Sequence, residues 1–187
     1  MLLLNWKKIS FREWPYMLHP RPVAIIASSY NGKVSAMPAS WIMPVSRDPP
    51  VVAVAISKKR FTYELIAGSR EFSVNILPKD FLDKIHYLGC VSGREEPDKI
   101  AKAGLTIAKG RKIGSPVILE SLAIAECTLW KNIEAGDHNI VVGRIVEIYA
   151  KPEFDIFNEE VFEKTSLHVG RNVYTYPVSK KIIVGGT

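Results

Sequence analysis

The chain has 187 residues, of which 47% are hydrophobic and 24% charged, and its formal net charge is +6. This composition excludes a disordered or fibrous protein, and the length predicts a single domain over residues 1–187, because about 100 to 200 residues are typical of one domain. No run of about eighteen apolar residues occurs, and the opening leucines precede the first basic residues instead of following them, so we expect no membrane-spanning helix, no signal peptide and a cytoplasmic location.

Strand patterns dominate the first part of the chain. Residues 23–28 are apolar and β-branched, the pair Asn31-Gly32 is a turn signal, and residues 33–36 resume the strand, which predicts a β-hairpin. Residues 51–56 are almost continuously apolar, as in a strand that is buried on both faces. We expect this strand at the centre of the sheet.

The middle of the chain alternates between short helices and one strand. Apolar residues at helical spacing, followed by Gly68, predict a helix over residues 61–67. Residues 71–77 alternate apolar and polar side chains, which predicts a strand with Asn75 on its polar face, away from the first core. The other helices expected from apolar periodicity are residues 79–88 and 96–103.

The second half of the chain is again rich in strands. Residues 117–119, 122–133 and 138–149 have strand patterns, and the last two are joined by a hairpin turn. Several strands without regular strand-helix alternation exclude a doubly wound parallel sheet and predict a mainly antiparallel β-barrel with flanking helices. The aromatic-rich residues 153–164 are expected to pack as an arm or helix, against this chain or a second subunit.

The sequence lacks the motifs of several enzyme and metal-binding classes. It has no Walker loop, no GxGxxG, no HExxH and no GxSxG, its histidines are scattered, and Cys90 and Cys127 lie far apart without CxxC spacing. We therefore expect no metal site, and a cofactor must carry any redox chemistry. Basic residues form short clusters interleaved with acidic ones, so neither a nucleic-acid partner nor a membrane partner is expected.

Residues 20–62 are the most informative stretch. They hold two apolar strands, a loop of small residues with Trp41, and a basic helix start with Arg60 and Thr62. The free amide groups of a helix start, together with basic and hydroxyl side chains, favour a phosphate. With the positive net charge, this pattern predicts a cradle for a planar, phosphorylated cofactor.

Several separated motifs, in this order, resemble the flavin reductase-like, FMN-binding split-barrel family, which includes flavoredoxin and archaeal ferric reductase. The motifs are RPVAIIASSYNGKVSAMPASWIMPVSRDPPVVAVAIS, Arg60 with Thr62, EFSVNIL, the pair Asp98-Lys99, and Gly136-Asp137-His138 before IVVGRIVEI. The resemblance covers about residues 15–176. It implies a six-stranded antiparallel split barrel with Greek-key character, flanked by helices, that forms a homodimer and holds FMN near the subunit interface.

The resemblance assigns the loop after the first hairpin to the flavin ring. Ala39, Ser40 and Trp41 occupy the position at which the family supplies backbone amides to the ring edge. Trp41 could instead be a core aromatic, the commoner fate of a tryptophan between apolar strands. Ser35 stands where close flavoredoxin relatives carry an asparagine, so its hydrogen bond to the flavin or ribityl chain is altered or lost.

A second group resembles the family's phosphate site. Ser57, Arg60 and Thr62 match its phosphate-binding cluster, and Lys99 matches a lysine that reaches the FMN. The alternatives are a solvated basic turn in which Thr62 caps the helix, and an ordinary exposed helix lysine.

Two further residues complete the implied site. His138 matches a histidine near the flavin, where it could hydrogen-bond the ring or a nicotinamide and exchange protons as the catalytic residue. Tyr174 resembles an aromatic residue that covers the flavin from one side. The alternatives are a histidine on the surface of the hairpin and simple docking of the chain end.

The implied activity is that of a flavoprotein oxidoreductase. FMN would accept a hydride from NADH or NADPH and pass electrons to free flavin, ferric iron or a redox protein. Two alternatives stay open: an FMN-binding electron carrier without pyridine-nucleotide activity, and a basic nucleic-acid-binding barrel. The same scaffold serves several functions, so the fold is inferred more directly than the activity.

Overall fold

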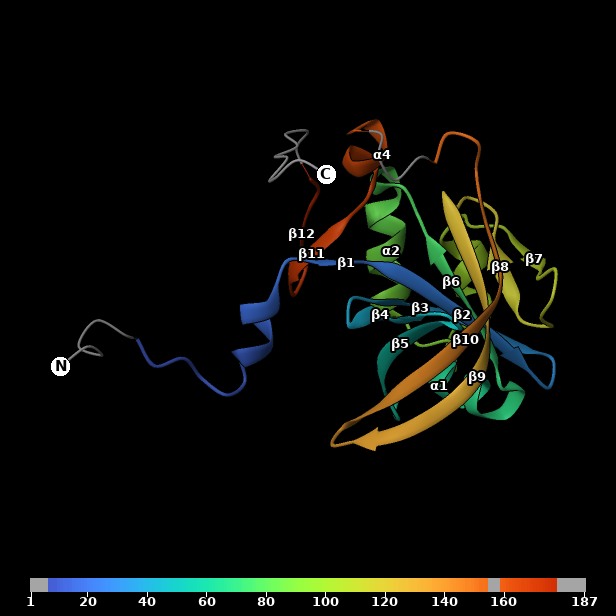
Figure 1. Cartoon of the computed structure of the whole chain (residues 1–187), viewed down its shortest axis with the longest axis horizontal. Coiled ribbons are helices and arrows are strands. Elements are labelled where there is room, and N and C mark those ends of the chain that lie inside the picture. Colours follow the sequence, from blue (N-terminus) through green and yellow to red (C-terminus); the bar gives the residue numbers. More distant parts are fainter. Residues whose placement is uncertain (1–6, 155–158, 178–187) are drawn as a thin grey trace.

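A seven-stranded antiparallel sheet forms the body of the molecule (Figure 1). The computed structural model describes residues 7–154 and 159–177. In spatial order the strands are β3 (Lys33–Ala39), β2 (Ala24–Tyr30), β6 (Glu71–Ile76), β9 (Ala123–Ala135), β10 (His138–Ala150), β5 (Pro50–Ser57) and β4 (Ile42–Arg47). The mainly β class with antiparallel pairing is confirmed, whereas the expected count of six strands is wrong.

The additional strand is β4, an edge strand that the sequence pattern did not reveal. It pairs with β5 and shifts register between Pro44 and Ser46. Proline lacks an N–H group and is therefore confined to edges and bulges of sheets, where β4 lies. Met43 and Val45 are exposed, so the strand shows no alternation between buried apolar and exposed polar residues.

The centre of the sheet is β9, so the expectation of a central strand at residues 51–56 is wrong. That segment is β5, which lies next to the edge between β10 and β4. Its apolar run is still explained, because Val54 and Ile56 face the main core while Val51 and Ala53 pack in a small cluster on the other face. A strand buried on both faces need not be central.

Two buried layers flank the sheet. The first core, inside the curved sheet, contains Ile26, Val54 and Phe72, and the second lies where α2 (Leu82–Cys90) packs on β3, with residues of β2 in the same cluster. Asn75 faces the second layer, where it is fully buried, donates to the carbonyl of Ile25 and accepts from the amide of Ile118. The polar face of β6 (Glu71–Ile76) is therefore buried in the second core and does not face solvent.

The remaining elements lie around this sheet. β7 (Ile107–Lys109) pairs with β8 (Pro116–Ile118), and β1 (Arg21–Pro22), β11 (Leu167–Gly170) and β12 (Val173–Thr175) form a three-stranded sheet. The helices other than α2 are η1 (Trp14–Leu18), α1 (Phe61–Ser69), η2 (Lys79–Phe81), α3 (Lys99–Lys102) and α4 (Glu159–Lys164).

Two helices differ from their expected lengths. The helix expected over residues 79–88 is divided into η2 and α2, and that expected over 96–103 shrinks to α3. Glu96 precedes Pro97, and the residue before a proline is disfavoured in the helical region, so the helix starts later. Part of the expected arm at residues 153–164 lies outside the described residues, and its last six residues form α4.

Candidate functional site

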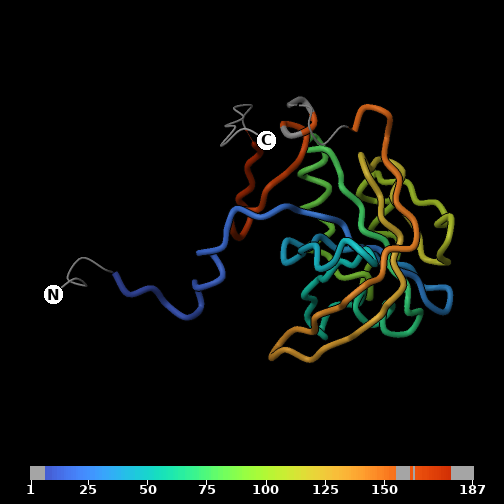
Figure 2. Tube along the Cα trace, viewed as in Figure 1, coloured from blue at the N-terminus to red at the C-terminus, as the bar shows by residue number. Residues whose placement is uncertain are grey.

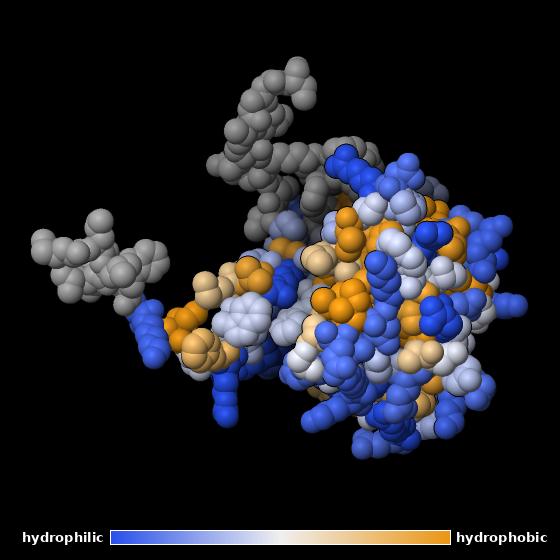
Figure 3. Space-filling view, turned by 60° about the horizontal axis from the view of Figure 1, so that its bottom comes forward, coloured by the Kyte–Doolittle hydropathy of each residue, from blue (hydrophilic) through white to orange (hydrophobic). Residues whose placement is uncertain are grey.

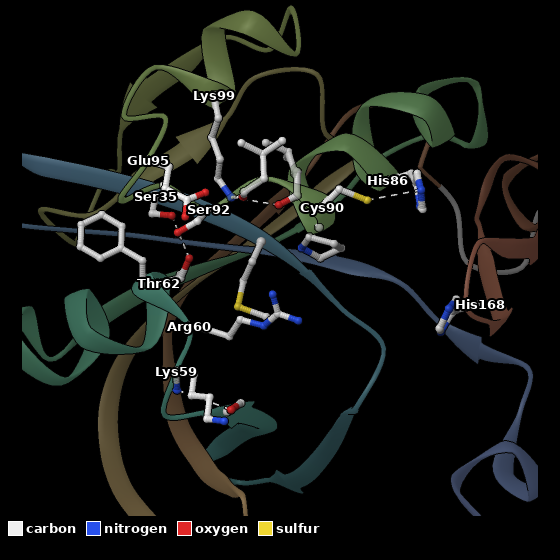
Figure 4. Close-up of a pocket in the computed structure, with 18 of the residues that line it drawn as sticks. Ser35, Lys59, Arg60, Thr62, His86, Cys90, Ser92, Glu95, Lys99 and His168 are labelled. Carbon is white, nitrogen blue, oxygen red and sulfur yellow. Dashed lines mark hydrogen bonds between the residues drawn. The ribbon is translucent and has the colours of Figure 1, made fainter. Parts of the chain in front are cut away.

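A cavity of about 720 Å³ opens beside the end of the barrel, where α1, α2 and β3 meet (Figure 4). A smaller pocket of about 160 Å³ continues it, since the two share Met37, Pro38, Ser57, Arg60 and His138. The residues predicted from the sequence all line one or both pockets. They are Ser35, Ala39, Ser40, Trp41, Ser57, Arg60, Thr62, Lys99, His138 and Tyr174.

One end of the cavity is built around the start of α1. Arg60 is the N-cap residue of this helix and makes no side-chain capping bond, so the first amide groups stay available to an anion. Thr62 is buried and donates its hydroxyl to Ser35 Oγ at 3.0 Å, and it does not cap the helix. Because Ser35 accepts this bond, its own proton is free to be donated to a ligand.

Lys99 reaches into this end from α3 (Figure 4). It is only 3% exposed, and its Nζ donates to the carbonyl oxygens of Leu88 and Val91 at 2.9 and 2.8 Å. An ammonium has three donors, so one remains for a ligand. Burial, and secondarily the charge of Arg60, lowers the pKa of Lys99 to about 8. The alternative of an ordinary exposed lysine is wrong.

The loop after α2 holds the cavity wall close to the start of α1. A Cβ added to Gly93 would lie 2.6 Å from Ser35 Oγ, so only glycine fits this approach. Arg94 donates to the carbonyl of Lys59 at 2.9 Å and pairs with Glu64 on α1. This contact could not be predicted from the sequence, because the residues that meet are about thirty positions apart.

The smaller pocket is formed by the connection between β3 and β4. The rings of Trp41 and His138 stack with centroids 4.9 Å apart, and the guanidinium of Arg21 lies 5.6 Å from the Trp41 ring. Trp41 is therefore half-buried against the pocket and not a core aromatic.

Asp137 orients the imidazole of His138. Its carboxylate lies 2.8 Å from Nδ1 of His138, and this hydrogen bond, followed by the charge interaction, lowers the pKa of Asp137. Because a carboxylate can only accept, Nδ1 carries the proton and Nε2 is the nitrogen left for a ligand.

The opposite end of the cavity carries aromatic and histidine side chains, and Figure 4 shows His86 and His168 there, away from Ser35 and Thr62. The Tyr174 ring lies 5.2 Å from that of His168 and 6.1 Å from that of His86. Burial, and then the neighbouring Cys90, raises the pKa of Tyr174. His86 and His168 were not predicted as site residues from the sequence.

Three hydrogen bonds involve the histidines at this end. Ser40 Oγ lies 3.2 Å from Nδ1 of His168, and Nε2 of His168 donates to the carbonyl of Arg171 at 3.0 Å. The thiol of Cys90 lies 3.4 Å from Nε2 of His86, one helical turn away on α2. The i,i+4 spacing of His86 and Cys90 is the one signal in the sequence that could have paired them.

The charge of the lining favours an anion. Among the described residues that line the larger cavity, Lys59, Arg60, Lys99 and Arg171 are basic and Glu95 is the one acid. Within the described ranges, no three His, Cys, Asp or Glu side chains are grouped to hold a metal ion, and no helix is long and apolar enough to cross a membrane. The arrangement can therefore bind a planar molecule with a negatively charged end.

Comparison with known proteins agrees with this geometry. The family model described as "Flavin reductase like domain" matches residues 16–168. An uncharacterized protein of Aeropyrum pernix is 36% identical over 148 residues, which are 79% of this chain and 56% of the relative. The chain thus spans little more than half the length of that relative.

Solved structures share the fold over nearly the whole chain. An FMN-binding protein from Thermus thermophilus, solved with bound p-hydroxybenzaldehyde, superposes with a TM-score of 0.83 at 28% identity and covers 96% of this chain and 97% of that chain. Flavoredoxin from Methanosarcina acetivorans has a TM-score of 0.84 at 24% identity, covering 96% and 95%, and this likeness shows the fold.

Proposed function

This chain belongs to the flavin reductase like domain family, and we propose that it is an FMN-binding oxidoreductase that takes a hydride from NADH or NADPH. The observation that carries the proposal is the cavity itself. One end joins an uncapped helix start to Arg60 and Lys99, and the rest is lined by stacking and hydrogen-bonding side chains. FMN has a matching phosphate, polyol and planar ring.

The donor set at the helix start fits a phosphate. Arg60 supplies charge and Thr62 stands in the first turn of α1, while Ser57 ends β5 just before it. Lys99 retains one ammonium donor after bonding two carbonyls of the wall. Charge-assisted hydrogen bonds of this kind are stronger than neutral ones, so this end would anchor the cofactor.

The middle of the cavity fits a flat ring. Ala39, Ser40 and Trp41 line the smaller pocket where β3 leads into β4, and their backbone amides would face the ring edge. A Cβ added to Gly89 on α2 would lie 2.9 Å from the Pro38 ring on β3, so α2 and β3 approach each other closely beside the cavity. Tyr174 would cover the ring from the far end.

FMN, when bound, would supply the hydride and single-electron chemistry. The residues of the chain bind and orient it and handle protons. With Nδ1 held by Asp137, Nε2 of His138 accepts a hydrogen bond when neutral and donates one when protonated. His138 is thus our candidate for proton exchange with the ring or the nicotinamide.

The electron acceptor would bind at the end of the cavity that carries Tyr174, His86 and His168. We propose free flavin, ferric iron or a redox protein as acceptors. The Thermus neighbour was solved with a small cyclic carbonyl compound, which adds that class to the candidates. The half-buried ring of Tyr174 and the imidazoles beside it would contact such a molecule.

The first experiment is absorbance of the purified protein, with and without added FMN. Flavin bands that stay with the protein through gel filtration are expected. Protein that neither carries nor gains these bands overturns the FMN site, and binding of nucleic acid by such protein would support the basic barrel instead.

The second experiment mixes the FMN-loaded protein with NADH and NADPH in a stopped-flow instrument. Bleaching of the flavin within seconds is the expected result. A flavoredoxin-like electron carrier is the second candidate, favoured by the flavoredoxin fold of the chain. No bleaching at saturating nucleotide, with full reduction by dithionite, would leave the carrier and exclude the reductase.

A further inference from the structure

The interior of the barrel is open to solvent on one side. A groove of about 310 Å³, which we call the barrel mouth, is lined by apolar side chains that include Ala24, Ile42, Met43, Val74 and Ile145. Ser46 is the one polar residue among the described residues that line it. Ala24 and Val74 belong to the first core, with Ile42 and Ile145 packed against it, so the mouth exposes part of the hydrophobic interior.

The segment before β1 presents the complementary feature. Residues 9–18, which we call the N-terminal arm, run away from the body of the molecule (Figures 1 and 2). Phe11 is 90% exposed, Met17 70% and Leu18 59%, and η1 contains no buried residue. Figure 3 shows apolar residues along this projecting segment. Burying an exposed apolar side chain of this size would stabilise the protein by about 1.5–3 kcal/mol.

The root of the arm is held in a definite direction. The guanidinium of Arg21 donates to the carbonyl oxygens of Leu18 and Pro15 at 3.0 and 3.1 Å. Among the described residues, none before Pro22 lines the barrel mouth of the same chain. The arm therefore begins at the edge of the mouth but leads away from it.

We propose that the N-terminal arm of one subunit packs into the barrel mouth of a second copy of this chain. The arm and the mouth are both apolar, and ten residues reach at most about 35 Å when extended, enough to cross to a neighbouring subunit. A two-fold axis would make the exchange reciprocal, so that each arm closes the partner's core. This inference names the contact surfaces of the homodimer expected for the proposed function.

Cross-linking tests the contact directly. Phe11 is replaced by the photoreactive p-benzoylphenylalanine in full-length protein, and ¹⁴N- and ¹⁵N-labelled chains are mixed, denatured and refolded together before illumination. Cross-linked peptides that join the arm of one isotope to residues 42–46 of the other are expected. Cross-links confined to one isotope, to another surface, or absent altogether overturn the proposal.

Analytical ultracentrifugation measures how much the arm and the mouth contribute to the stability of the dimer. The double variant W14D/M17D in the arm and M43D in the mouth should each raise the dimer dissociation constant at least tenfold, because a carboxylate cannot enter the apolar groove. L119D is the matched control, since Leu119 is equally exposed, at 51%, but lies outside the mouth.

Measuring FMN binding alongside dimerisation distinguishes the failure of the arm exchange from the failure of the proposed function. A wild-type protein that is monomeric, or variants that dimerise as wild type does, overturn the arm exchange even if FMN binds. A dimer that depends on the arm but carries no FMN would instead overturn the proposed function and leave the exchange standing. Circular dichroism of each variant shows whether the barrel is folded.

Discussion

At the residue scale, the site depends on a few buried polar side chains whose partners are now identified. Thr62 and Ser35 are bonded to each other, and Lys99 is bonded to two carbonyl oxygens of the wall. Their types and positions could be predicted from the sequence through the family motifs. Their partners could not, because the bonds join residues 8, 11 and 27 positions apart, beyond the reach of a local pattern.

The phosphate assignment predicts a loss of FMN affinity on substitution. Arg60→Gln should lower the affinity for FMN about tenfold to a hundredfold, because it removes a charged donor to the phosphate. Thr62→Val should lower it about tenfold, because it removes a hydroxyl that supports the phosphate end. Fluorescence titration measures both. Lys58→Gln is the control, since Lys58 pairs with Glu134 and does not line the cavity. Unchanged affinity in Arg60→Gln and Thr62→Val would refute the assignment.

Lys99 predicts a pH dependence of binding. Its pKa of about 8 lies below the usual 10.5, and a bound phosphate favours the protonated form. Affinity for FMN should therefore be highest below pH 8 and fall as the pH rises through this value. Titrations from pH 7 to pH 9.5 measure the effect.

Two variants isolate the contribution of Lys99. Lys99→Met should bind FMN weakly with no fall above pH 8, and Lys99→Arg should bind it without that fall, because arginine keeps its charge. A wild-type profile that is flat across this range would show that the ammonium does not act on the cofactor.

At the element scale, a buried carboxylate on the central strand β9 holds a neighbouring loop. Glu126 on β9 is fully buried and accepts hydrogen bonds from the amides of Arg111, Lys112 and Ile113 and from the hydroxyl of Tyr149. The strand pattern of residues 122–133 was recognised in the sequence. A carboxylate pointing inward from it was not, since three of its four partners are amides of a loop that has no regular pattern.

This network predicts a stability effect. Burial alone raises the pKa of Glu126, but bonds from Lys112, Arg111, Tyr149 and Ile113 outweigh it, and the pKa is lowered below 4.5. A lowered folded pKa stabilises the protein above the unfolded value, and this contribution is lost as the pH falls through the folded one. Glu126→Gln should cost about 2–3 kcal/mol at pH 7.

Urea unfolding at pH 7 and at pH 3.5 measures this effect. The difference between wild type and Glu126→Gln should be large at pH 7 and smaller at pH 3.5, because pH 3.5 lies below the ordinary value of 4.5 and the contribution of a lowered pKa is progressively lost there. Glu153→Gln is a control at an exposed position outside this network. Equal losses at both pH values would show that packing, and not charge, accounts for the effect of Glu126.

At the scale of the whole molecule, cofactor binding should stabilise the fold. FMN at a hundredfold excess over its dissociation constant contributes about 2.7 kcal/mol, which raises the Tm of a domain of this size by about 5–11 °C. Differential scanning calorimetry measures the shift. Riboflavin, which lacks the phosphate, is the matched ligand and should give a smaller shift at the same concentration. Equal Tm shifts with FMN and riboflavin would show that the phosphate does not contribute to binding.

By itself, the sequence determined the mainly antiparallel barrel, the absence of enzyme-defining motifs and ten of the residues that line the two pockets. Apolar alternation and turn residues act locally, and the family motifs carry the cavity residues, so both can be read without coordinates. Only the tertiary structure decided that β9 is central, that Pro44 lies in an edge strand, and that His86, Cys90 and Gly93 share the cavity. These features depend on pairing between remote segments, which no local pattern encodes.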